Sequence, residues 1–173
     1  MEIRKSITVD QSIDKVWQIM ATDYTKVGDW TSQITLSKNN DEVKTKLQDA
    51  PAGGRVCTAP GFGDVKETIT RFDEGKKAFS YKADISSMPF FVKGIANNWS
   101  FRPLGPKKTE VNMRIELHLN AFPGTLMAPI MRSQLGKTSN IILEELKYYA
   151  ETGSVHPRKL KALKKAGRTP ATA

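Results

Sequence analysis

The sequence predicts an α+β fold in which a curved antiparallel sheet of about seven strands wraps around one long C-terminal helix. The first reason is a series of short segments in which apolar and polar residues alternate, separated by turn residues at regular intervals. Such a series is typical of an antiparallel meander with one buried face. The second reason is a final segment whose apolar residues recur at helical spacing, and which is long enough to cross a whole sheet.

The chain begins with one predicted strand and two short helices. Residues 2–9 alternate in polarity, which indicates the first strand. Asp10 or Ser12 can cap a helix there, because apolar residues then recur at helical spacing through residues 13–20. A second short helix is expected near residues 24–30.

Six more strands are expected after these helices. Ile34 and Leu36 mark a short one, and the clearest covers residues 109–120, where one side is apolar and the other polar. The strands between them are expected near residues 55–59, 64–72, 77–85 and 95–103. The breaks between these strands contain Gly, Pro and Asp, the residues that turns require.

The last predicted element is a helix roughly 40 Å long. It follows the break at Pro123-Gly124 and ends at Gly153, while Pro129 falls in the first turns, where its missing N–H is tolerated. The apolar stripe of this helix consists of Met127, Met131, Leu135, Thr138, Ile142, Leu146 and Tyr149. Burial of this stripe requires that the helix lie across the concave face of the sheet.

Length and charge indicate one domain with a basic end. A chain of 173 residues suits a single domain, and its formal net charge is +9. Residues 154–173 contain six Lys and Arg residues and no acidic residue. We therefore predict a ligand-binding domain at residues 1–153 and a basic C-terminal tail at residues 154–173.

The basic tail has two interpretations. It is either a solvated chain end or a segment that contacts anionic lipid headgroups. Nucleic acid is not an expected partner, because no aromatic residues interleave with the charges. The sequence has no run of about 18 apolar residues and no apolar signal segment before the first strand, which predicts a cytoplasmic protein.

No pattern in the sequence indicates a metal or another cofactor, and we expect none. His118, His156 and the single cysteine, Cys57, are far apart in the sequence and form no ligand motif. The same separation argues against a Cys/His or Ser/His nucleophilic pair.

Arg55 and Glu67 fall on neighbouring predicted strands that are joined by the turn at residues 60–63. Val65, Glu67 and Ile69 lie on the more apolar side of their strand, so the Glu67 carboxylate is expected to point inward, with Arg55 as its partner. One interpretation is a structural ion pair. The other is a polar anchor, or an acid, that faces a ligand.

Apolar and aromatic residues gather on the surfaces that the fold turns toward each other. The candidate ligand-binding residues are Arg55, Glu67, Phe79, Tyr81, Met88, Phe91, Asn97, Trp99, Met113, Met127, Met131 and Leu135. Taken singly, most of these side chains are also what an ordinary core contains. Together, a wall rich in Met and aromatic residues suits adaptable apolar recognition, with Tyr81 and Asn97 as the polar groups that orient a ligand.

Several segments, in order, resemble one family. ITVDQSIDKVWQIMATD, VGDW, the stretch from Gly53 to Ile85 with Arg55, Glu67 and Tyr81, and NNWSF followed by TEVNMRIELHL are similar to the START/Bet v 1-like (SRPBCC) superfamily of polyketide cyclases, dehydrases and lipid transport proteins. The likeness covers about residues 2–152 and implies a helix-grip fold with an internal hydrophobic cavity.

Three functions are compatible with these observations. The first is binding or carriage of a small hydrophobic molecule, such as a lipid or polyketide, in the cavity. The second is a cyclase/dehydrase-type enzyme in which Glu67, Tyr81 or Arg55 polarises a carbonyl group or moves a proton. The third is an interaction module with a filled core. The sequence leaves open whether any reaction is catalysed.

Overall fold

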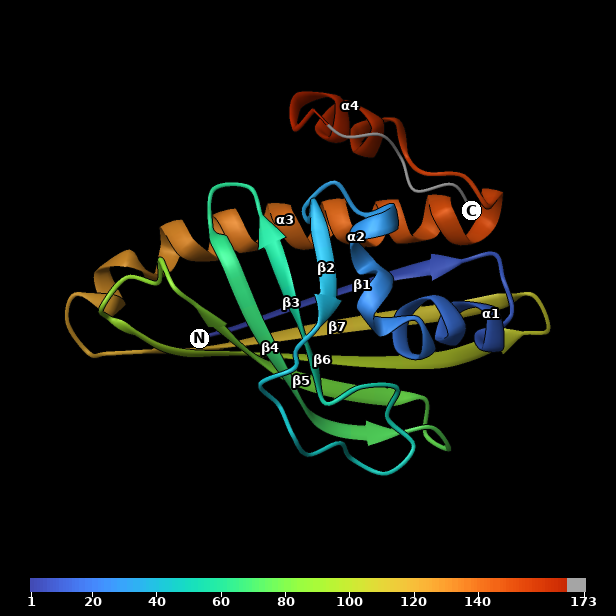
Figure 1. Ribbon diagram of the computed structural model, residues 1–173, viewed down its shortest axis with the longest axis horizontal. Coiled ribbons are helices and arrows are strands. Elements are labelled where there is room, and N and C mark those ends of the chain that lie inside the picture. Colours follow the sequence, from blue (N-terminus) through green and yellow to red (C-terminus); the bar gives the residue numbers. More distant parts are fainter. Residues whose placement is uncertain (168–173) are drawn as a thin grey trace.

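The sheet has seven antiparallel strands in the order β1-β7-β6-β5-β4-β3-β2 and bends around one long helix (Figure 1). The structure is a computed structural model that describes residues 1–167. The strands are β1 (Glu2–Val9), β2 (Leu36–Asn39), β3 (Gly54–Ala59), β4 (Gly63–Asp73), β5 (Ala78–Ile85), β6 (Val92–Gly105) and β7 (Lys108–Leu119). The predicted helix-grip architecture, a curved antiparallel sheet with a long C-terminal helix, is therefore confirmed.

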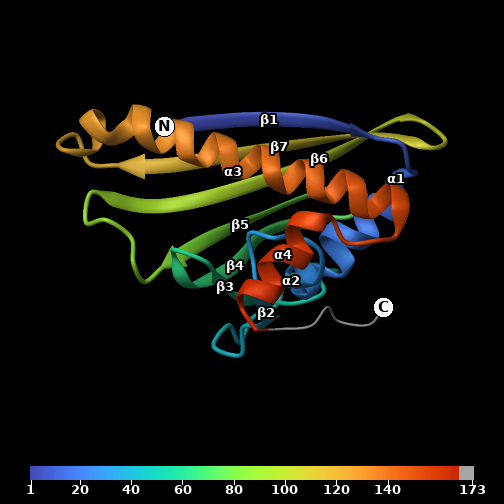
Figure 2. The same ribbon diagram turned by 90° about the horizontal axis from the view of Figure 1, so that it is seen from above.

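The long helix α3 (Gly124–Thr152) lies across the concave side of the sheet (Figure 2). Its second half is tightly packed, since Leu143, Leu146 and Ala150 are buried in the main core. Its first half is only partly buried along the side that faces the sheet. Gly153 ends α3 with a left-handed backbone (φ 70°), the conformation that favours glycine at this position.

Four short helical elements connect β1 to β2 and cover one end of the sheet. They are α1 (Ile13–Trp17), the π-helical turn η1 (Gln18–Thr22), the 3-10 turn η2 (Tyr24–Lys26) and α2 (Val27–Trp30). The Trp17 ring lies 6.1 Å from the Phe79 ring and 5.6 Å from the Phe101 ring. These aromatic contacts fill the concave side beneath the short helical elements. The other end of the sheet is covered by α3 and not by these elements.

Residues that follow α3 form a further helix, α4 (Pro157–Lys165), which the sequence did not predict. Arg158 Nε donates to Glu145 Oε1 at 3.1 Å, and Lys159 Nζ donates to the carbonyl oxygen of Ile34 at 2.7 Å. Lys159 is 1% exposed and Leu163 is also buried. Residues 157–165 therefore pack on the domain, in contrast to the expected solvated end, because their cations find buried acceptors. The final part of the expected tail, residues 168–173, lies outside the described residues.

Between residues 1 and 167, no helix is both long enough and apolar enough to cross a membrane.

Candidate functional site: a cavity under the first half of the long helix

A cavity of about 460 Å³ lies between the sheet and the first half of α3. The sheet side of its wall includes Val65, Ile95 and Ile115, and the helix side includes Met131 and Leu135, with Ile142 at its inner end. The cavity extends to the β3–β4 and β5–β6 turns at the end of the molecule that is away from α1. Its size is within the range of pockets that hold one small organic molecule.

Strand alternation and helical spacing together build this wall. Tyr81 on β5 is paired with Asn97 on β6, and Asn97 is in turn paired with Ile115 on β7, so their side chains point to the same concave face. On the opposite side, Met127, Met131 and Leu135 recur every four residues and face the sheet.

Tyr81 and Asn97 form a polar site within this apolar wall. Asn97 Nδ2 donates to the Tyr81 hydroxyl at 3.0 Å, while Asn97 Oδ1 has no partner although the residue is only 8% exposed. Burial, and next the nearby Glu67 carboxylate, raise the pKa of Tyr81 well above its ordinary value, so the phenol keeps its proton at neutral pH. The pair therefore offers one acceptor, Asn97 Oδ1, and one donor, the Tyr81 O–H.

Arg55 and Glu67 form a buried ion pair next to this polar site. They are directly paired across β3 and β4, and Arg55 Nε lies 2.6 Å from Glu67 Oε2. The Tyr24 hydroxyl donates to the same carboxylate oxygen at 2.9 Å, and Arg55 Nη1 donates to the Tyr24 carbonyl oxygen. Gly54 allows the close approach of the two strands, because a Cβ at that position would lie 2.1 Å from the Glu67 carbonyl oxygen. The predicted pairing of Arg55 with Glu67 is present.

Cys57 also lies on the cavity wall, two residues after Arg55 on β3. Burial raises the pKa of its thiol to about 11. The thiol is therefore protonated at neutral pH and is a poor nucleophile. Among residues 1–167, no three His, Cys, Asp or Glu side chains come together as a metal site requires.

Most of the candidate ligand-binding residues lie together on the cavity wall. Those that line it are Glu67, Tyr81, Met88, Phe91, Asn97, Met113, Met127, Met131 and Leu135. Arg55, Phe79 and Trp99 lie outside the wall of this cavity. Arg55 is covered by the Tyr24 ring at 4.0 Å, and Phe79 stacks on Trp99 with ring centroids 6.4 Å apart, both in the region filled by the helical elements.

Several other residues of the wall were not predicted from the sequence. Gln33 and Ile34 precede β2, and Pro60–Phe62 form the β3–β4 turn. The alternation of Ile34 with Leu36 indicates a strand and not a cavity wall, and no periodic pattern marks the other loop residues. Ser139 is different, because it follows Thr138 of the predicted helical stripe and its position at the edge of that stripe could have indicated it.

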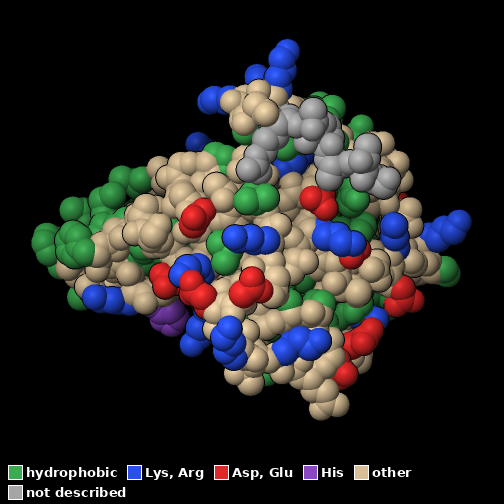
Figure 3. Space-filling view, in the orientation of Figure 1, with side chains coloured by type: hydrophobic (Ala, Val, Ile, Leu, Met, Phe, Trp, Pro, Cys, Tyr) green, Lys and Arg blue, Asp and Glu red, His purple; other side chains and the backbone are tan. Residues whose placement is uncertain are grey.

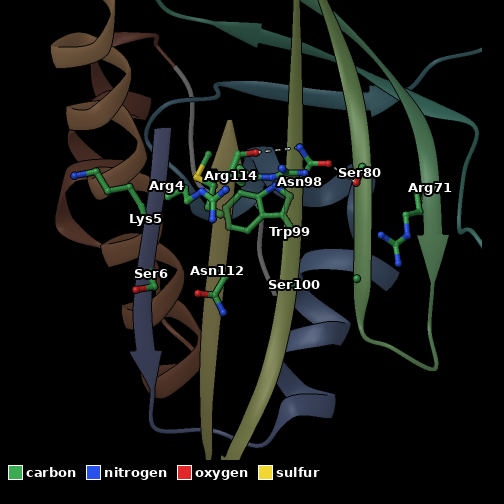
Figure 4. A pocket seen from close by; sticks show the side chains of 12 residues that line it. Arg4, Lys5, Ser6, Arg71, Ser80, Asn98, Trp99, Ser100, Asn112 and Arg114 are labelled. Carbon is green, nitrogen blue, oxygen red and sulfur yellow. Dashed lines mark hydrogen bonds between the residues drawn. The ribbon is translucent and has the colours of Figure 1, made fainter. Parts of the chain in front are cut away.

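A second, open hollow lies on the convex face of the sheet (Figure 4). The polar side chains near its centre are hydrogen-bonded, since Ser80 Oγ donates to Asn98 Oδ1 at 2.8 Å and Asn98 Nδ2 donates to Glu116 Oε1 at 3.2 Å. Arg114 pairs with Glu116 at 2.8 Å. Because neighbouring residues of a strand point to opposite faces, Asn98 belongs to this hollow whereas Asn97 belongs to the cavity.

Comparisons with known proteins agree with this architecture. A family model described as "Polyketide cyclase / dehydrase and lipid transport" matches residues 1–151. No curated protein matches the sequence.

Three solved structures illustrate the fold similarity. A START superfamily protein from Mycobacterium smegmatis is 14% identical with a TM-score of 0.68, covering 88% of this chain and 99% of that one. The di-domain ARO/CYC BexL from the BE-7585A biosynthetic pathway is 14% identical with a TM-score of 0.67, covering 86% of this chain and 45% of that one. Ara h 8.0201 is 12% identical with a TM-score of 0.65, covering 87% of this chain and 97% of that one. At these identities the structures show a common fold.

Proposed function

The chain belongs to the polyketide cyclase/dehydrase and lipid transport family, and from this premise we propose that it binds one small, mostly apolar molecule in the cavity beneath the first half of α3. Family and fold are those of a START/polyketide-cyclase-like ligand-binding domain. The observation that carries the proposal is a cavity of about 460 Å³ with an apolar wall and one unpaired buried acceptor, Asn97 Oδ1.

The polar pair suggests what kind of group the ligand carries. A hydroxyl group both donates and accepts, so it fits Asn97 Oδ1 and the Tyr81 O–H at once. A buried acceptor without a partner is costly, and a ligand hydroxyl removes that cost. We therefore propose an apolar alcohol or phenol whose hydroxyl lies at this pair and whose apolar part lies against the Met residues of α3.

A carrier is favoured over an enzyme of the cyclase/dehydrase type. General acid–base catalysis at neutral pH is most efficient with a group whose pKa lies near 7. Around the cavity, Tyr81 and Cys57 keep their protons because burial raises the pKa of both groups, and Glu67 is held in an ion pair with Arg55. A filled-core interaction module is disfavoured by the cavity itself.

Substitution of Met131 tests the proposal, because Met131 lines the cavity on the helix side. We expect Met131→Trp to fill the cavity and to abolish saturable binding of the dye 1-anilinonaphthalene-8-sulfonate. Leu160→Trp is the matched control, since Leu160 is exposed on α4, away from the cavity. The control should bind the dye as the wild type does. Equal binding by the Met131 variant, or dye binding that never saturates, contradicts the proposal.

A further inference from the structure

The end of the molecule at which the cavity reaches the loops has an exposed apolar surface, which we call the apolar tip. It consists of Phe62, Phe90, Phe122, Leu126 and Ile130. Phe90, Phe122 and Leu126 are 76%, 80% and 70% exposed, more than any other large hydrophobic residue in the described part of the chain. Figure 3 shows hydrophobic side chains gathered at the left end of the molecule, where α3 begins in Figure 1.

Hydrogen bonds between three loops hold the tip together. Ser87 Oγ donates to the Phe62 carbonyl oxygen at 2.7 Å, which joins the β5–β6 loop to the β3–β4 turn. The Asn120 N–H donates to the Phe91 carbonyl oxygen at 2.8 Å, which joins the β5–β6 loop to the β7–α3 connection. The apolar side chains of the tip therefore lie on one surface whose loops are held together by hydrogen bonds.

The first turns of α3 are apolar on two sides. Met127 and Met131 face the cavity, and Leu126, which is 70% exposed, faces outward. Ile130 lies between these two sides, because it lines the rim of the cavity and is 52% exposed. A helix segment that is apolar on both sides is normally covered by another structure. Among residues 1–167, nothing covers the outer side, so the occupant of this surface is external to the described chain.

The charges around the tip indicate what covers it. Residues 85–93 and 118–137 contain no Asp or Glu, whereas they carry Lys93, Arg132 and Lys137. The third loop of the tip contributes one carboxylate, Asp64, which accepts a hydrogen bond from Thr58 Oγ1 at 2.9 Å. Exposed aromatic side chains next to cations and with few carboxylates match the interface of an anionic lipid bilayer, where rings insert at headgroup level and cations meet phosphates.

We propose that the apolar tip docks on an anionic membrane surface, with Phe90, Phe122 and Leu126 inserted among the headgroups. Phe62 and Met88, from two of these loops, and Met127, from the first turn of α3, line the cavity, so docking places the cavity next to the bilayer. The proposal goes beyond ligand binding and does not depend on it. It also differs from contact through the basic C-terminal segment, because α4 lies over the other half of α3 (Figure 1).

Sedimentation with vesicles tests the proposal on the full chain. The vesicles are equal parts phosphatidylcholine and phosphatidylglycerol, compared with phosphatidylcholine alone. We expect the wild type to bind the anionic vesicles. The affinity of the triple variant Phe90→Ser/Phe122→Ser/Leu126→Ser should be lower by a factor of about ten or more, since most of the inserted apolar surface is lost. The double variant Lys93→Glu/Arg132→Glu should bind the anionic vesicles more weakly than the wild type does, while its binding to the phosphatidylcholine vesicles should not change.

Two control variants make the test specific. Leu104→Ser removes an exposed apolar side chain near the end of β6, and Lys161→Glu/Lys164→Glu changes the charge of α4. Both should bind vesicles as the wild type does. Thermal melting and dye affinity, both measured without vesicles, show whether the fold and the cavity of each variant are intact. A variant that has lost vesicle binding can therefore be distinguished from one that has lost ligand binding.

Three results overturn the proposal. The first is a wild type that binds neither kind of vesicle, and the second is a triple variant that binds as tightly as the wild type. The third comes from light scattering after gel filtration: a wild-type dimer that the triple variant splits into monomers means that a second copy of the chain covers the tip.

Discussion

Arg55 and Glu67 face each other across β3 and β4 at 2.6 Å, and each residue is only 5% exposed. A buried charge without its partner is far more costly than the pair is beneficial, because the remaining charge cannot reach water. The Tyr24 hydroxyl, which shares the Glu67 oxygen, adds to the same network. The pair therefore connects β3, β4 and η2 at the edge of the cavity.

We predict strong coupling between these two residues. Arg55→Met and Glu67→Leu should each reduce the free energy of unfolding by about 3–5 kcal/mol, and the double variant should lose clearly less than the sum. Urea denaturation of the four proteins measures the coupling. Lys66→Ala and Glu42→Ala form a matched control, because this exposed pair bridges neighbouring segments at 2.7 Å. The effects of the control substitutions should add, and additive effects at Arg55 and Glu67 would contradict a buried pair.

Asn97 gives a prediction about the polar group of the ligand. Asn97→Leu removes the unpaired acceptor, so the variant should bind 1-naphthol about tenfold more weakly while naphthalene binds as well as before, or better. Displacement of the cavity dye measures both affinities. Asn98→Leu is the control, because Asn98 lies one residue away but on the convex face. Equal losses for the two compounds would mean that Asn97 shapes the wall without binding a hydroxyl group.

Much of the fold could be predicted from local pattern. The strand at residues 109–120 alternates so regularly that β7 (Lys108–Leu119) nearly coincides with it, and the predicted stop at Gly153 is where α3 ends. Helix α4 was missed because its stability comes from distant partners. The acceptors of Arg158 and Lys159 are Glu145 and the Ile34 carbonyl oxygen, and no periodicity links those positions. A charged segment was therefore interpreted as solvated.

The wall of the cavity could be predicted only in part for a similar reason. Alternation correctly indicates that Phe79, Tyr81, Asn97 and Trp99 all point to the concave side. It does not indicate which stretch of that side is filled. Trp17, from the distant α1, packs against Phe79 and converts that stretch into core, whereas Tyr81 and Asn97 remain at the cavity.

Cys57 leads to a prediction about alkaline pH. Burial raises the pKa of its thiol from an ordinary value of 9.0 to about 11, so between these values the unfolded state loses the proton while the native state keeps it. The free energy of unfolding should therefore fall as the pH rises above 9.0. Tyr24 and Tyr81 also have raised pKa values, and Cys57→Ala separates their contribution.

The comparison of wild type with Cys57→Ala isolates the thiol. At a pH of roughly 10.5 the wild type should have lost about 2 kcal/mol more than the variant, relative to their difference near neutral pH. Urea denaturation under reducing conditions across this range gives the two curves. Parallel curves would mean that the thiol titrates in the native state as it does in water.

The last prediction concerns removal of the segment after Gly153. We propose that residues 1–153 form the complete ligand-binding domain, since the sheet and α3 end there and the family model matches residues 1–151. The truncated chain should keep its fold but lose about 2–4 kcal/mol of unfolding free energy. Without Arg158, the donors that remain to the fully buried Glu145 carboxylate among residues 1–167 are Thr31 and Ser32.

Single substitutions in the full chain identify the source of this loss. Leu163→Ala removes a buried side chain of α4 and should lower the melting temperature, whereas Leu160→Ala, at an exposed position of the same helix, should not. Circular dichroism at rising temperature compares both variants with the truncated and intact chains. If the truncated chain has the same melting temperature as the wild type, the segment after Gly153 does not stabilise the domain. The solvated end that the charge pattern predicted would then be the better description. If the truncated chain no longer folds, the domain extends to the end of α4. The native structure would then depend on the hydrogen bonds of Arg158 with Glu145 and of Lys159 with the Ile34 carbonyl oxygen.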